Sequence, residues 1–140
     1  MPKAKQPNAE LYRILDANLN RAKEGLRVCE DVCRYIRDDR KLTRDFKDIR
    51  HDLTDAIGKA NILKALQHRD IGGDVGQETT ASEGKRSDVN AVFFANAQRV
   101  KESLRVLEEI LKLADGKSAD RMKLLRYRFY AIEQKSLKTR

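Results

Sequence analysis

The sequence predicts an all-α protein: an antiparallel four-helix bundle built from two repeated helical hairpins joined by a Gly-rich loop. Three observations predict it, namely four segments with helical spacing of apolar residues, an internal repeat, and the lack of any segment with strand-like alternation. The chain has 140 residues, enough for one compact domain. It is far shorter than a (β/α)₈ barrel, which needs about 250 residues. We therefore expect a single helical domain over residues 1–140.

The first hairpin is predicted over about residues 9–67. Its apolar residues recur at alternating steps of four and three, which places them on one face of each helix. They are Leu15, Leu19, Ala22, Leu26, Cys29, Cys33 and Ile36, followed by Leu42, Phe46, Ile49, Leu53, Ala56, Ala60 and Leu63. Asn8 and Asp39 precede these two segments, and their side chains can cap the first backbone N–H groups of a helix.

The second hairpin is predicted over about residues 88–138. Its apolar positions are Phe93, Ala97, Val100, Leu104, Leu107, Leu111 and Ala114, then Met122, Leu125, Phe129 and Ile132. Asp88 and Ser118 are the expected caps, and Gly116 marks the turn between the helices. The loop at 68–87 contains four of the seven glycines, and a loop of this length in a compact helical domain is more often functional than merely connecting.

Residues 17–35 repeat at 95–113 with a constant offset of 78, and 9 of these 19 positions are identical. Most of the identities are polar: Asn18/Asn96, Arg21/Arg99, Lys23/Lys101, Glu24/Glu102, Arg27/Arg105 and Glu30/Glu108. A second echo aligns KDIRHDL at 47–53 with KLLRYRF at 123–129. The repeat unit is therefore a helix pair, and because its polar residues are repeated we expect it to repeat a site.

Asn18 and Glu30 border the apolar face of the first helix on opposite sides. An unpaired buried polar group costs roughly 1 to 3 kcal/mol, so both side chains need partners or must face a cavity. Two interpretations stay open from the residues alone. These side chains and their copies either pair with arginines across the bundle and fix its register, or they line a ligand pocket between helices.

The composition limits the classes of partner. A net charge of +8 attracts polyanions, but acids and bases are mixed along the chain and aromatic residues make up only 6%, so nucleic acid is not the favoured partner. No run of about 18 apolar residues could span a membrane, and MPKAKQPNAE lacks the apolar segment of a signal peptide. We expect a cytoplasmic protein without membrane contact. Cys29 and Cys33, replaced by leucine in the repeat, are expected to be reduced core thiols.

Three ordered motifs carry a family resemblance. They are YRILDANLNRAKEGLRVCED at 12–31, RDIGGDVG at 69–76 and FANAQRVKESLRVLEE at 94–109. From Leu11 to about Leu137 the chain resembles the helical domain at the N-terminus of some bacterial thiamine phosphate synthases, the non-ribokinase type of hydroxymethylpyrimidine-phosphate kinase. The resemblance implies a role in thiamine biosynthesis, in which ATP phosphorylates hydroxymethylpyrimidine phosphate to the diphosphate. It implies ATP and Mg²⁺ as cofactors, and no synthase barrel within these residues.

Phosphoryl transfer to a phosphate monoester needs no catalytic base, because the acceptor is largely ionised at pH 7. It needs cations to align two anions and carboxylates to hold Mg²⁺. The catalytic candidates are Arg27, Arg105, Arg69 and Arg86; the substrate-binding candidates are Asn18, Arg21, Glu30, Asn96, Arg99, Glu108 and Arg50; the metal candidates are Asp31 and Asp74, with Glu30 and Glu108 besides. The asparagines would read the aminopyrimidine edge, and the loop around Gly72, Gly73 and Gly76 would close over the phosphates.

Gly25 lies inside the first helix, where the repeat has Ser103. A helix-interior glycine costs up to about 1 kcal/mol relative to alanine, so we expect it to permit close approach by another helix or a ligand. This difference makes the two half-sites unequal, and we predict that the first repeat holds the pyrimidine.

Two other functions remain open for this sequence. The domain could be a non-catalytic accessory or docking domain of thiamine phosphate synthase, or a basic helical module that binds RNA. Neither function requires polar residues beside the apolar faces. Duplicated hairpins with long apolar faces also favour further association, which leaves a homodimer open.

Overall fold

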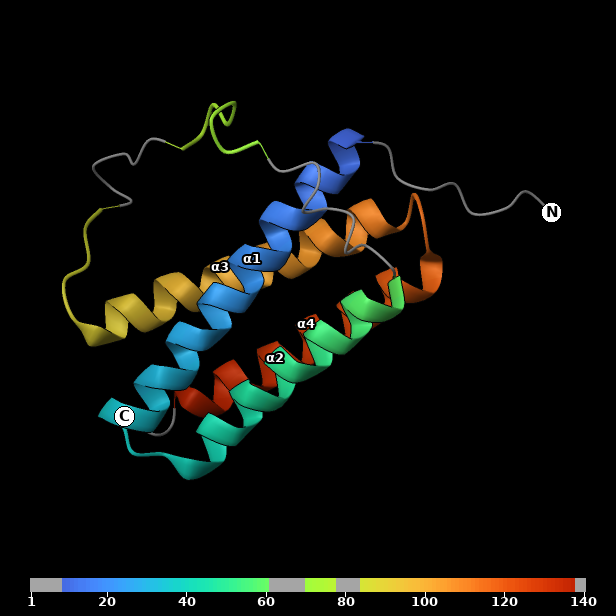
Figure 1. Cartoon of the computed structure of the whole chain (residues 1–140). Coiled ribbons are helices and arrows are strands. Elements are labelled where there is room, and N and C mark those ends of the chain that lie inside the picture. Colours follow the sequence, from blue (N-terminus) through green and yellow to red (C-terminus); the bar gives the residue numbers. More distant parts are fainter. Residues whose placement is uncertain (1–8, 61–69, 78–83, 138–140) are drawn as a thin grey trace.

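The computed structural model describes residues 9–60, 70–77 and 84–137, and the predicted all-α fold is confirmed within them (Figure 1). The helices are α1 (Ala9–Asp31), α2 (Arg40–Ala60), α3 (Val89–Leu111) and α4 (Gly116–Ser136), and one π-helical turn, η1 (Val32–Ile36), extends α1. These described ranges contain no strand.

The two hairpins are stacked so that equivalent helices meet. α1 packs against α2 and α3 packs against α4, while α1 also contacts α3 and α2 also contacts α4 (Figure 1). Cys29 of α1 contacts the Phe93 carbonyl near the start of α3, whereas Gly25, one turn earlier in α1, lies against Asn96 and Val100, farther along α3. α1 and α3 are therefore antiparallel. None of the helices within the described ranges is long and apolar enough to cross a membrane.

The predicted caps are confirmed at two helices and wrong at one. The carboxylates of Asp39 and Asp88 each accept a hydrogen bond from the backbone N–H three residues later, at 2.9 and 2.8 Å. At α4 the cap is Asp115 and not Ser118, because a carboxylate accepts from both the Lys117 N–H, at 3.1 Å, and the Ser118 hydroxyl, at 2.7 Å. Asn8 lies outside the described residues.

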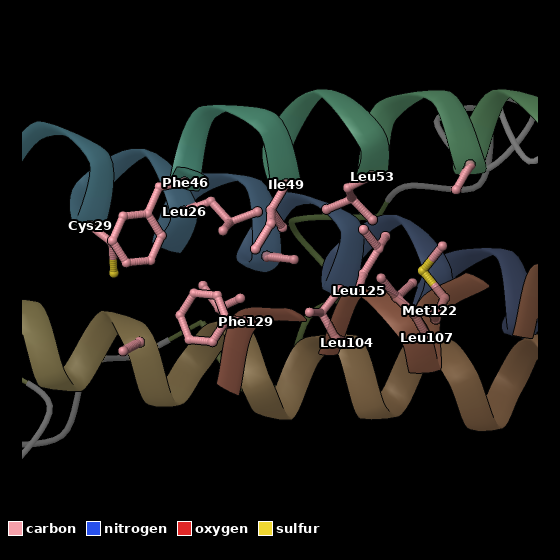
Figure 2. Packing of buried hydrophobic residues seen from close by; sticks show 14 of the residues in the cluster. Leu26, Cys29, Phe46, Ile49, Leu53, Leu104, Leu107, Met122, Leu125 and Phe129 are labelled. Atoms are coloured by element: carbon pink, nitrogen blue, oxygen red, sulfur yellow. The ribbon is translucent and has the colours of Figure 1, made fainter. Parts of the chain in front are cut away.

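The core contains nearly all of the predicted apolar positions that the structure describes. Figure 2 shows Phe46 of α2 close to Phe129 of α4, with ring centroids 5.7 Å apart, and Phe46 also lies 5.9 Å from Phe93 of α3. Ile36 is the clear exception, with 63% of its surface exposed. It lies in η1, and a π turn holds more residues per turn than an α turn, so the side chains that follow are rotated off the apolar face.

Cys29 and Cys33 are fully buried and free, as expected for core thiols. Burial raises the pKa of Cys33 to about 11, and burial also raises the pKa of Cys29. A raised native pKa means that the thiols stay protonated in the folded state while unfolded thiols ionise near pH 8.5. Their stabilising contribution is therefore complete below that pH and is lost as the pH rises.

Between pH 8 and 10, we expect the free energy of unfolding of the Cys33→Ala variant to fall by about 1 kcal/mol less than that of the wild type. Urea unfolding at several pH values measures the difference. If the free energy of unfolding depended on pH in the same way for both proteins, the expectation would be contradicted. The comparison cancels lysine and tyrosine titrations that both proteins share.

Candidate functional site

A groove of about 800 Å³ lies between the amino-terminal half of α1 and the described loop at 70–77, within the size range of small-molecule sites. The loop runs beside this part of α1 in Figure 1. Charged and amide side chains of α1 that line the groove include Arg13, Asp16, Asn18 and Arg21. Asp70 and Asp74 line it from the loop and Val106 lines it from α3, so all three motifs that carry the resemblance contribute to the groove.

The groove is lined by charged side chains that are mainly acidic, although the chain as a whole is basic. Its lining contains five carboxylates, from Glu10, Asp16, Glu24, Asp70 and Asp74, but only two guanidinium groups, although the chain as a whole has a net charge of +8. Such a lining favours ligand groups that donate hydrogen bonds. An anionic group would have to lie beside an arginine or enter with a metal cation.

The loop is shaped by its own aspartates. The Asp70 Oδ1 accepts a hydrogen bond from the Gly73 N–H at 2.8 Å, and the Asp74 Oδ1 accepts one from the Gly76 N–H at 2.9 Å. A Cβ atom at Gly73 would collide with the Asp70 carboxylate. A side chain at position 73 would therefore displace the Asp70 carboxylate from the position in which it accepts the Gly73 N–H.

The duplicated asparagines use their side-chain donors within their own helices. The Asn18 Nδ2 donates to the Ile14 carbonyl at 2.9 Å, and the Asn96 Nδ2 donates to the Val92 carbonyl at 2.8 Å. Asn18 lines the groove, where the Arg21 Nη1 lies 3.5 Å from its Oδ1. No residue equivalent to Asn18 or Arg21 in the second repeat is among the residues described as lining this groove.

The duplicated glutamates are buried in equivalent ion pairs. The Glu30 carboxylate lies 3.1 Å from Arg50 of α2 and 3.6 Å from Arg27. The Glu108 carboxylate lies 3.0 Å from Arg126 of α4, and Arg105 is 3.8 Å away. The pairs with Arg50 and Arg126 join the two helices of each hairpin, as the register interpretation requires.

Sequence reasoning did not select Arg126, although the second echo aligns it with Arg50 and so carried the signal. It also missed Arg13 and Asp16, which line the groove but are not conserved between the repeats. Identity between the repeats selects what both hairpins share. It cannot select a residue that only one of them uses.

The remaining candidates are spread over the molecule. Arg27, Arg105 and Arg99 are exposed on α1 and α3, and Asp31 is half-buried at the end of α1. The exposed Arg86 donates to the Lys85 carbonyl at 2.8 Å, and Arg69 lies outside the described residues. Thus the described candidates brought together at the groove are Asn18, Arg21 and Asp74, and the two copies do not converge on one cavity.

No group of three or more histidine, cysteine or acidic side chains in the described part of the chain is arranged to hold a metal ion. Mg²⁺ does not require such a cage. It commonly binds through one or two carboxylates together with substrate phosphates and water. Asp74 and its neighbour Asp70 fit that limited role.

The fold and the groove define an all-α domain of two repeated hairpins with a polar site on the first repeat. A model of the ThiD2 family matches residues 13–135, and the chain belongs to this family. The match confirms the resemblance to the helical domain of thiamine phosphate synthases.

Curated relatives agree with this assignment. The chain is 48% identical over 124 residues to a thiamine-phosphate synthase of Synechocystis and 44% identical over 128 residues to one of Rhodopirellula baltica. These alignments cover 88% and 89% of this chain but 35% and 34% of the relatives, so the chain spans about a third of their length. No solved structure matches the chain.

Proposed function

We propose that this domain acts in thiamine biosynthesis as an ATP-dependent kinase that converts hydroxymethylpyrimidine phosphate to the diphosphate. The observation that carries the proposal is the groove, which has the volume of a ligand site and is lined by Asn18, Arg21 and Asp74 from the family motifs. The names of the relatives support the pathway, and membership of the ThiD2 family supports assigning this step to the helical domain.

The groove offers the groups that such a transfer requires. An oxygen of the substrate monoester attacks the γ-phosphorus of ATP, a new P–O bond forms, and the bond to the leaving ADP breaks. Because the acceptor is already ionised, the lack of a histidine among the lining residues is no obstacle. Arg13 and Arg21 would bind phosphate oxygens through bidentate hydrogen bonds.

The many carboxylates of the groove would repel ATP unless a cation accompanied it. Asp70 and Asp74 are the residues that would hold Mg²⁺, which when bound neutralises charge on the phosphates. The loop at 70–77 brings both carboxylates to the lining of the groove.

The test is turnover by the purified protein. Given hydroxymethylpyrimidine phosphate, ATP and Mg²⁺, it should release ADP and the pyrimidine diphosphate in equal amounts. The Arg21→Ala variant should lose about tenfold to a hundredfold in kcat/KM, because a charge-assisted phosphate contact is removed. Arg44→Ala, which removes an exposed arginine of α2, is the control and should retain activity.

A second function, that of a non-catalytic accessory domain, is favoured by one observation. The relatives are about three times as long as the matched segment, so in them this domain is joined to a larger partner. Absence of turnover by a folded protein, together with stimulation of a separate thiamine-phosphate synthase, would support this function and reject the kinase.

A further inference from the structure

We propose that Arg13 and Asp16 make the first repeat the substrate-binding half. Asp16 would recognise the amino group of an aminopyrimidine, and Arg13 would bind the phosphate carried by the same molecule. The inference rests on the proposed function for the identity of the substrate, and it adds the residues that select the substrate.

Asp16 is a buried acid at the edge of a large groove. Only 5% of its surface is exposed, yet it lines the groove beside Asn20, whose Nδ2 donates to the Asp16 Oδ1 at 3.3 Å. A carboxylate has about four acceptor positions, so an acid that already has partners in the protein can also accept a hydrogen bond from a ligand.

The repeat supplies an internal comparison. The offset of 78 places Phe94 at the position of Asp16 and Ala91 at the position of Arg13. Phe94 is partly buried and packs on Phe93 with ring centroids 5.7 Å apart. The fold therefore accepts an apolar side chain at this helical position, so bundle packing does not require the acid at residue 16.

Three other polar groove residues of α1 do not distinguish the halves, since Asn18, Arg21 and Glu24 are identical in the second repeat. Arg13 and Asp16 are thus the charged α1 residues of the groove for which the repeat has uncharged counterparts. Residues three apart share a side of a helix, so both can reach one ligand.

The two side chains fit opposite ends of a phosphorylated aminopyrimidine. Carboxylate oxygens accept hydrogen bonds, so Asp16 suits an exocyclic amino group and disfavours an oxo group at the same position. Arg13 suits the phosphate, which it can bind through two parallel hydrogen bonds. With these roles for Asp16 and Arg13, the protein should select the 4-amino substrate over its 4-oxo analogue.

Calorimetric titration without ATP tests this selection separately from catalysis. The probes are hydroxymethylpyrimidine phosphate, its 4-oxo analogue, and unphosphorylated hydroxymethylpyrimidine. The wild type should prefer the 4-amino phosphate, and Asp16→Asn should weaken that binding by about tenfold to a hundredfold while the 4-oxo analogue binds no worse. Arg13→Ala should weaken both phosphates and leave the unphosphorylated compound unchanged.

Glu102→Gln is the matched control, because it removes an exposed acid of α3 at the position equivalent to Glu24. Circular dichroism and thermal unfolding establish that each variant is folded. An unchanged 4-amino preference in folded Asp16→Asn would overturn the inference, whether or not the protein turns over ATP. A lost preference in a protein without kinase activity would uphold the inference and reject the kinase alone.

Discussion

Replacing Arg126 with methionine should lower the free energy of unfolding by about 3 to 5 kcal/mol. Arg126 is 8% exposed and donates to the Glu108 carboxylate and to the Tyr130 hydroxyl, each at 3.0 Å. Those hydrogen bonds, to Tyr130 first and then to Glu108, raise the pKa of the guanidinium above its ordinary value. Methionine fills similar space but leaves the buried Glu108 without its nearest cation.

Urea unfolding of the purified variant measures this loss. Arg128→Met is the control, because Arg128 and Asp52 form an ion pair whose side chains are 44% and 49% exposed, and exposed pairs contribute only about 0 to 1 kcal/mol. The double variant Glu108→Leu/Arg126→Met should recover much of the loss, since it leaves no unpaired buried charge between α3 and α4. Equal effects at Arg126 and Arg128 would show that the buried pair does not stabilise the hairpin as described.

Replacing Gly25 with alanine should lower the free energy of unfolding by about 2 to 3 kcal/mol. A Cβ atom at this position would lie 2.7 Å from the Val100 Cγ2 and 2.9 Å from the Asn96 carbonyl oxygen. Both atoms belong to α3, and the carbonyl is part of a regular helix that cannot shift alone. The two helices would have to separate where they cross.

Gly58→Ala is the matched control for this effect. Gly58 also lies inside a helix, but no atom is within 4 Å of the position of an added Cβ. Alanine should therefore stabilise α2 by up to about 1 kcal/mol through its higher helix propensity. Chemical denaturation of both variants should give shifts of opposite sign, and a stabilised Gly25→Ala would contradict the close crossing of α1 and α3.

The helices and most of the core could be predicted because each depends on local spacing. The exposure of Ile36 could not be predicted, since nothing in the apolar pattern indicated the π-helical turn η1, which rotates this side chain off the apolar face. Gly25 was predicted to permit a close approach, and the structure identifies α3 as the partner. That identity depends on packing between the hairpins, which local spacing does not encode.

The candidate site was only partly predictable for a similar reason. Identical residues in the two repeats pointed to Glu30 and Glu108, which lie in equivalent ion pairs. The groove instead takes its polar side chains from the first repeat and from the loop, which brings Asp70 and Asp74 to the groove, while the second repeat contributes Val106. Which helix a long loop approaches depends on contacts distant in sequence, and repetition gives no information about it.

The crossing of α1 and α3 resembles the contact between two subunits, but here a single chain supplies both sides. In a symmetric pair of half-length chains, every substitution would occur twice. Covalent linkage removes that constraint: glycine at 25 can face valine at 100 while serine occupies 103, and aspartate at 16 can coexist with phenylalanine at 94. Fusion thus allows one half to specialise while the other continues to support the shared architecture.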